Sequence, residues 1–203
     1  PVIDKGIPMV FFFFFFEDIN TSQVFTDSYQ IALECTEHLI QQGCKRIGHF
    51  TNTRPISIFK DRLRGYKEAL IANGLTYDES LVVESNLQLE DGRDSMLQLL
   101  NRKELPDGIF SASAYGILGA LQVLIEKGFR VPQDVALVGF SNEPYTSFTE
   151  PALSTVEQHS LRMGNAAAEI FLEEVSDEEK TFIPQKIVLK PELIIRQSSL
   201  RKK

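Results

Sequence analysis

The chain has 203 residues, of which 43% are hydrophobic and 24% are charged, and its formal net charge is −7. This length and composition indicate a globular protein with one α/β domain or two small lobes, large enough to bury a core without disulfides or metals. The negative charge excludes a general attraction of this chain for nucleic acid. No apolar run is long enough to cross a membrane.

Strand-like and helix-like segments alternate along the chain. Strands are expected at residues 7–10, 46–51, 81–83, 108–112, 135–140, 152–156, 187–189 and 193–195. Helices are expected at residues 27–42, 57–73, 89–101, 117–127 and 160–175, the first, second and fourth of them ending at Gly43, Gly74 and Gly128. Residues 135–140 read VALVGF, which is typical of a strand buried on both faces. The alternation predicts a parallel, doubly wound sheet.

Six consecutive phenylalanines occupy residues 11–16. In a strand this run places three rings on each face, and such a segment is an aggregation hazard. We therefore leave open whether the run is the true sequence. A ring that stacks on a ligand is the alternative for single positions, and Phe14 is the candidate.

The two cysteines, Cys35 and Cys44, have no metal-ligand spacing around them. They predict two reduced, partly buried thiols in a cytoplasmic protein. The chain starts at Pro1 and shows no basic-then-apolar leader. We expect it to be a fragment or a processed product of a longer protein.

Residues 135–175, VALVGFSNEPYTSFTEPALSTVEQHSLRMGNAAAEIFLEEV, resemble the lactose/galactose-repressor family of bacterial transcription regulators. The matching features are an apolar strand that ends in Gly-Phe, a Pro-x-Leu-Ser-Thr-Val strand followed by Gln, and a Met-Gly pair that opens an Ala-rich helix. CTEHLIQQGCKRI at 35–47, DRLRGYKEAL at 61–70 and ELPDGIF at 104–110 match as well. The likeness covers essentially the whole chain.

The resemblance implies an α/β fold of two doubly wound parallel-sheet lobes, as in type I periplasmic binding proteins, with the first lobe incomplete. Residues 1–26 and 159–187 are expected in the head-proximal lobe, and residues 27–158 and 188–203 in the distal lobe. The helix-turn-helix head is expected to be absent from this chain. The implied function is a ligand-sensing domain that binds a sugar-like molecule between the lobes and controls operator DNA through the missing head. A homodimer without cofactor, metal or membrane contact is expected.

Ligands of open α/β sheets bind outside the carboxyl ends of the strands. Arg62, near the start of the helix at 57–73, matches the family's ligand-binding arginine, and its planar guanidinium suits vicinal hydroxyls or a carboxylate. The alternative is a solvated or salt-bridged arginine. Asp27 lies at a predicted helix start, where it caps the helix, faces the cleft as in the family, or does both.

Four further positions match places where the family contacts its ligands. Leu87 falls where relatives often have a stacking aromatic residue, and Ile58 lies in the variable loop before the arginine. Ser113 replaces the first residue of a common Asn-Asp pair, and Ser141 stands where an aspartate often holds ligand hydroxyls. Because serines make fewer charge-assisted hydrogen bonds, we expect a ligand other than a standard hexose, or modest affinity.

Enzyme chemistry has no support in the sequence. Residues 57–60 fit an S-x-x-K pattern, but its companion motifs are missing. The three histidines are isolated, and neither a P-loop nor a nucleophile elbow occurs. The alternative function is a periplasmic solute-binding protein of an ABC transporter, which shares the fold. The segments EPALSTVEQ and RMGNAAAEI are closer to the regulators.

Overall fold

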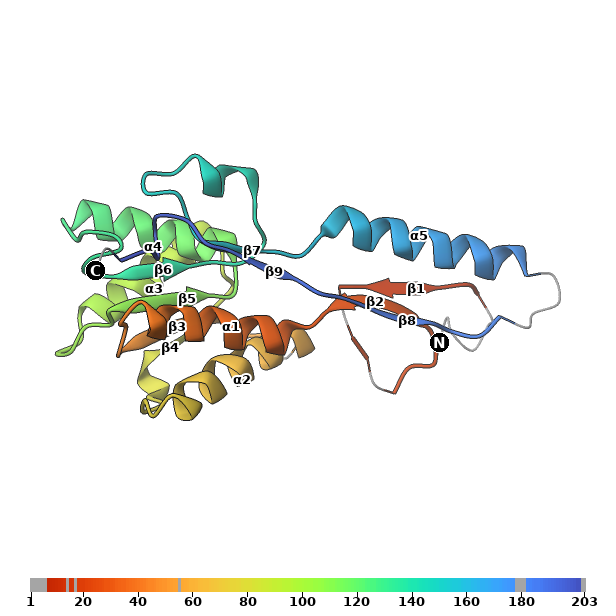
Figure 1. Cartoon of the computed structure of the whole chain (residues 1–203), viewed down its shortest axis with the longest axis horizontal. Coiled ribbons are helices and arrows are strands. Elements are labelled where there is room, and N and C mark those ends of the chain that lie inside the picture. The colour runs from red at the N-terminus through yellow and green to blue at the C-terminus, as the bar shows by residue number, and fades with distance from the viewer. Residues whose placement is uncertain (1–6, 14, 17, 55, 178–181, 202–203) are drawn as a thin grey trace.

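A computed structural model describes the chain except for residues 1–6, 14, 17, 55, 178–181 and 202–203. The molecule is elongated, with a large lobe at one end and a small lobe at the other (Figure 1). The large lobe contains α1 to α4 and β3 to β7 with β9, and the small lobe contains β1, β2, β8 and α5.

The large lobe is built around one parallel sheet with the strand order β4-β3-β5-β6. Its strands are β3 (Ile47–Asn52), β4 (Val82–Ser85), β5 (Gly108–Ser111) and β6 (Ala136–Val138). The helices are α1 (Ser28–Gln41), α2 (Ser57–Ala72), α3 (Leu89–Leu100) and α4 (Ala114–Glu126), with short 3-10 turns η2 (Glu79–Leu81) and η3 (Pro144–Ser147).

Both faces of this sheet are covered. Phe110 and Val138 pack with α1 and α2, whereas their strand neighbours Ile109 and Leu137 pack with α3 and α4. Successive strand residues thus point to opposite cores, as the apolar VALVGF segment predicts. Both cysteines are free and buried in the core under α1 and α2.

The small lobe has a parallel sheet with the order β1-β2-β8, formed by β1 (Val10–Phe12), β2 (Ser22–Thr26) and β8 (Lys186–Leu189). Helix α5 (Ser160–Ser176) packs on it through Met163 and Ile170, which meet Val24. The predicted α/β fold with doubly wound parallel sheets is confirmed.

Between the two sheets, β7 (Thr155–Glu157) and β9 (Glu192–Ile194) form an antiparallel pair. The chain crosses between the lobes three times, from β2 to α1, from β7 to α5 and from β8 to β9 (Figure 1). The predicted lobe boundary between residues 187 and 188 falls inside β8, and the predicted domain limits stay a prediction. Within the described residues, no helix combines the length and apolarity needed to cross a membrane.

Strand β2 is absent from the sequence prediction because most of its buried residues are polar, Val24 being the exception. Gln23 is completely buried, yet its side chain accepts a hydrogen bond from the Phe16 amide at 2.8 Å and donates to the Phe16 and Ile19 carbonyls at 2.9 and 3.3 Å. These bonds remove most of the cost of burying an amide. Strand β1 begins at Val10 and not at Ile7, so it includes part of the phenylalanine run.

Candidate functional site

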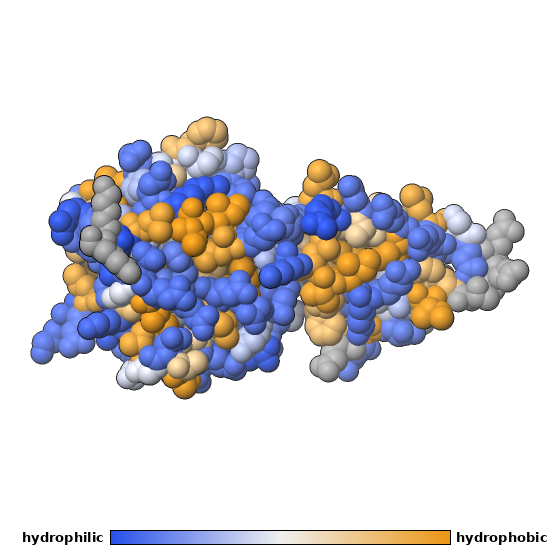
Figure 2. All heavy atoms as spheres, in the orientation of Figure 1, coloured by the Kyte–Doolittle hydropathy of each residue, from blue (hydrophilic) through white to orange (hydrophobic). Residues whose placement is uncertain are grey.

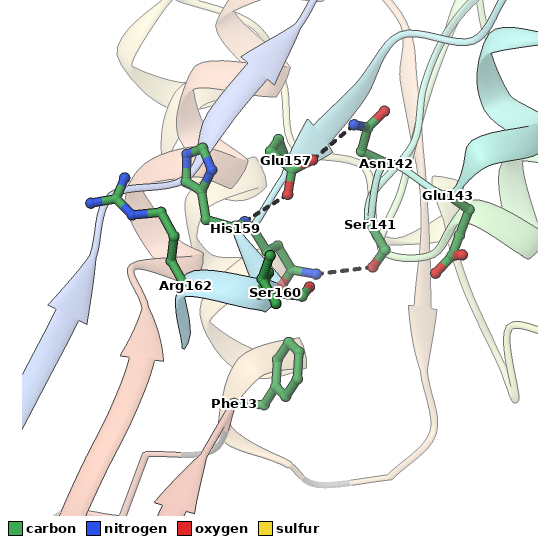
Figure 3. A pocket seen from close by; sticks show the side chains of 10 residues that line it. Phe13, Ser141, Asn142, Glu143, Glu157, His159, Ser160 and Arg162 are labelled. Carbon is green, nitrogen blue, oxygen red and sulfur yellow. Dashed lines mark hydrogen bonds between the residues drawn. The ribbon is translucent and has the colours of Figure 1, made fainter. Parts of the chain in front are cut away.

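Two adjoining cavities open at the carboxyl ends of the strands, between the lobes. The first, here called the His159 cavity, has a volume of about 620 Å³ and is lined by Phe13, residues 141–143 and residues 157–162. The second, the Arg62 cavity, has a volume of about 350 Å³. Phe13, Ser141 and Gln158 line both. Phe13 follows β1 of the small lobe, and Figure 3 shows its ring pointing toward Ser160 at the start of α5.

Among the non-glycine residues that the structure describes, those with a positive φ angle all lie at these cavities. Four such residues have positive φ angles: Phe13 at 71°, Leu87 at 60°, Ser141 at 66° and His159 at 56°. Each follows a strand, and each lines one or both cavities. Non-glycine residues adopt this conformation at a cost, and such positions gather at ligand clamps and active sites.

Arg62 is the central polar residue of the Arg62 cavity. The residue is 4% exposed. Nη1 donates to the Ala112 carbonyl at 3.0 Å and Nη2 donates to Oε1 of Gln158 at 3.3 Å. The guanidinium carbon lies 3.5 Å from the centre of the Phe140 ring. Burial lowers the pKa of Arg62 to about 9, so the side chain keeps its charge at neutral pH.

Gln158 connects Arg62 to the rim, because its Nε2 donates to Oγ of Ser141 at 3.1 Å (Figure 3). Beside it, Glu157 accepts from the Asn142 amide at 2.8 Å and from the His159 backbone N–H at 2.6 Å. Burial opposes the ionisation of Glu157, but these hydrogen bonds outweigh it and hold the pKa of the carboxyl below its usual range. The carboxylate of Glu157 is therefore held in a fixed position at the His159 cavity.

Five of the predicted site residues come together at the Arg62 cavity: Ile58, Arg62, Leu87, Ser113 and Ser141. Ser113 also caps α4, since its Oγ accepts from the Tyr115 amide at 3.2 Å, and it donates to the Leu87 carbonyl at 3.1 Å. The cap explains why α4 begins at Ala114 and not at Ile117 as the periodicity predicts. The ligand contacts of these five residues stay a prediction.

Asp27 lines neither cavity. Its Oδ1 accepts from the Gln30 amide at 2.8 Å, so it caps α1 as the sequence predicts. It lies in a separate hollow beside Lys190 and Pro191, and its predicted cleft role gains no support from this position. Phe14 lies outside the described residues, while its neighbour Phe13 lines both cavities.

Several lining residues escape the sequence prediction. Asn52 ends β3 and Asn86 follows β4. Both could have been predicted, because ligand sites of parallel sheets gather at the carboxyl ends of the strands. Gln158 directly follows β7, so the same rule applies to it, but its contacts with Arg62 and Ser141 join residues distant in sequence and show only in the folded chain. Among the described residues, no group of three or more potential metal ligands occurs.

A family model for the periplasmic binding protein-like domain matches residues 36–199. The chain belongs to this family. It is 34% identical over 180 residues to the HTH-type transcriptional repressor PurR of Haemophilus influenzae (strain PittEE). The alignment covers 88% of this chain and 54% of that protein. It is also 34% identical over 179 residues to the HTH-type transcriptional regulator CelR of Thermobifida fusca, with 88% and 52% covered. The chain spans about half the length of the curated relatives it matches.

Solved structures give the same result. The structure of a transcriptional regulator CelR–cellobiose complex superposes with a TM-score of 0.88 at 32% identity, over 95% of this chain and 59% of that one. A putative transcriptional regulator LacI from Bacillus cereus subsp. cytotoxis gives a TM-score of 0.90 at 27% identity, over 97% and 70%. The predicted resemblance to the lactose/galactose-repressor family is confirmed. A transport protein is less well supported, since these relatives carry the names of regulators.

Proposed function

We propose that this chain is the effector-sensing part of a bacterial LacI-type transcription regulator and that a small, sugar-like molecule binds between its lobes. The observation that carries the proposal is the Arg62 cavity, where a buried guanidinium lies among apolar walls at the carboxyl ends of four strands. Ligand sites of this kind combine apolar surfaces with a few polar groups that fix orientation.

The lining residues divide into two chemical sets. Arg62, Ser141, Gln158, Asn52 and Asn86 offer hydrogen bonds to hydroxyl or carbonyl groups of a ligand. Aromatic and aliphatic side chains provide the flat surface on which a sugar or base ring rests; these are Phe13, Ile58, Phe59, Leu87 and Tyr115.

Regulation follows from the two-lobed form. A ligand that touches Phe13 of the small lobe and Arg62 of the large lobe binds most tightly to one arrangement of the lobes and stabilises it. The lobes already contact each other beside Ile58, where Oγ of Ser57 donates to the Phe15 carbonyl at 3.2 Å. In our proposal the lobe arrangement sets the geometry of a DNA-binding head in a cytoplasmic homodimer.

Calorimetric titration with hexoses, disaccharides including cellobiose, and nucleosides tests the sensing function. We expect one compound to bind with measurable heat and to raise the melting temperature. Arg62→Lys should weaken that binding about tenfold or more, because an ammonium lacks the planar fork of donors.

The control is Arg64→Lys, which changes a 56%-exposed side chain on the same helix and should leave the affinity unchanged. If none of these compounds binds, the sensing function is wrong. The regulatory function is tested by operator mobility shifts of the full-length gene product with and without the bound compound. It fails if the shift is the same in both.

A further inference from the structure

Another hollow lies at the junction of the lobes, apart from the two cavities of the candidate site. It has a volume of about 270 Å³ and is here called the crossover hollow. Its lining comes from both lobes, with Asp27, Ile31 and Glu34 on α1 and its cap, and residues 188–191 on β8 and the peptide that follows it. None of its lining residues lines the Arg62 or the His159 cavity. The hollow is therefore separate from the candidate effector site.

The walls of the crossover hollow include a large apolar part. Ile31 is 1% exposed and Pro191 is buried. Leu189 packs in the core of the small lobe, whereas Val188 points away from that core and is 54% exposed. An apolar group that packs against Val188 would remove this surface from water. At about 30 Å³ for each water-sized group, the hollow has room for about nine non-hydrogen atoms.

Charged side chains of both signs line the same hollow. Asp27 and Glu34 are seven residues apart, so they lie on one side of α1, about 10 Å apart along its axis. Lys190 lines the hollow from the peptide between β8 and β9. In the described part of the chain, none of the three forms an ion pair.

The hydrogen bonds of the two carboxylates leave one oxygen of each for a ligand. Oδ1 of Asp27 accepts from the Gln30 backbone amide at 2.8 Å, and Oε1 of Glu34 accepts from the Gln30 side chain at 3.0 Å. Within the described residues, the second oxygen of each carboxylate has no partner, and neither has the ammonium group of Lys190. The hollow can therefore match a cationic and an anionic group of one ligand.

We propose that the crossover hollow is a second ligand site, which binds an α-amino acid with an apolar side chain. The ammonium group of the ligand pairs with Asp27 or Glu34 and its carboxylate with Lys190, while its side chain packs on Ile31 and Val188. An amino acid of the size of leucine fits the volume. A simple amine leaves Lys190 unmatched, and a fatty acid leaves both carboxylates unmatched. The inference goes beyond the proposed function, because this site lies outside the effector cleft.

Binding at the crossover hollow is coupled to the arrangement of the lobes. Asp27 stands at the crossing from β2 to α1, and Lys190 at the crossing from β8 to β9 (Figure 1). Since the walls belong to different lobes, a change in the lobe arrangement alters the shape of the hollow. An amino acid bound there changes the affinity of the cleft for its own ligand, and the cleft ligand changes amino-acid affinity by the same factor. Only this coupling, and not the binding itself, rests on the proposed function.

Calorimetric titration of the chain with leucine, isoleucine, valine and methionine tests the site. We expect at least one of them to bind. Analogues of the tightest binder then each lack one recognised group; for leucine they are 3-methylbutylamine without the carboxylate, 4-methylpentanoate without the ammonium group, and glycine without the side chain. Each analogue should bind about fivefold or more weakly than the amino acid.

Substitutions place the ligand in the crossover hollow. Lys190→Met and Glu34→Gln each remove one charge and should weaken amino-acid binding about two- to fivefold, the range for ion pairs that water reaches. Lys103→Met and Glu169→Gln are the controls, since these exposed residues line neither this hollow nor the two cavities. They should leave the affinity unchanged. Arg62→Lys alters the cleft and should also leave amino-acid binding unchanged.

Failure of every amino acid to bind would overturn the inference and leave the sensing function intact. An amine or a fatty acid that binds as tightly as the amino acid would also overturn it, because one charged group of the hollow would then have no role. Loss of amino-acid binding in Arg62→Lys, with no effect of Lys190→Met, would place the ligand in the cleft and would equally overturn the inference.

Discussion

The two lobes stabilise parallel sheets in different ways. The sheet of the large lobe is covered on both faces, and its strands alternate between two apolar cores. In the small lobe one helix covers one face, and the buried core residues in the described part are Val24, Met163 and Ile170. Val188 alternates with core residues of β8 and is 54% exposed, so apolar surface remains on this lobe (Figure 2). Apolar burial dominates one lobe, whereas side chain-to-backbone bonds such as those of Gln23 support the other.

The largest expected difference between the lobes is in the free energy of unfolding that is lost when one core side chain is removed. Phe110→Ala deletes a completely buried ring of the large lobe and should lower the free energy of unfolding by about 3–5 kcal/mol. Ile170→Ala on α5 should cost about 2 kcal/mol, at the low end for such changes, because its neighbours Ala166 and Ala167 are only partly buried.

Urea unfolding followed by circular dichroism measures both changes. Equal losses for Phe110→Ala and Ile170→Ala would show that the small-lobe core carries as much stability as the large one, and the comparison would be wrong.

Acid should act mainly on the large lobe, where His49 is completely buried between the rings of Tyr66 and Phe110. Burial lowers the pKa of His49 to about 4 from 6.5. The folded state therefore keeps this imidazole neutral while the unfolded state takes up a proton. Stability is lost as the pH falls from 6.5 to about 4, by about 3 kcal/mol from this residue.

Denaturation curves between pH 7 and pH 4 check this effect. His49→Phe should flatten the pH dependence, because it removes the buried group that takes up a proton on unfolding. An unchanged slope in His49→Phe would mean that the burial of His49 does not control acid stability.

A glycine-to-alanine substitution should lower the free energy of unfolding in the large lobe and raise it in the small lobe. In Gly92→Ala of α3 the new methyl group would meet the backbone carbonyl of Gly116 in α4, so we expect a loss of about 1–3 kcal/mol. In Gly164→Ala of α5 the methyl group meets open space, and we expect a gain of about 0.5–1 kcal/mol. Thermal melts of the two variants show the contrast, and a gain for Gly92→Ala would disprove close packing of α3 on α4.

The large lobe was more predictable from sequence than the small one. Its helices start and end within a few residues of the predicted bounds, because apolar spacing and the stops at Gly43, Gly74 and Gly128 are strong local signals. Strand β2 was missed because hydrogen bonds from Gln23, and not hydrophobicity, permit its burial.

The candidate site was only partly predictable. Arg62, Leu87 and Ser141 follow from the family resemblance, and the structure brings them to one cavity. Phe13 and Gln158 were missed, since their place depends on how the chain crosses between the lobes. The neutral partners of Arg62 are also a property of the folded molecule alone.

The three crossings give neither lobe a continuous stretch of sequence. A protease that cuts near Lys190, between β8 and β9, leaves the two halves connected by the peptides after β2 and after β7. Such a nicked molecule should migrate as one particle in native gels and separate into pieces only after denaturation. The two lobes separate only when all three connecting peptides are cut. Partial digestion that cuts one or two of them therefore leaves the lobes covalently joined.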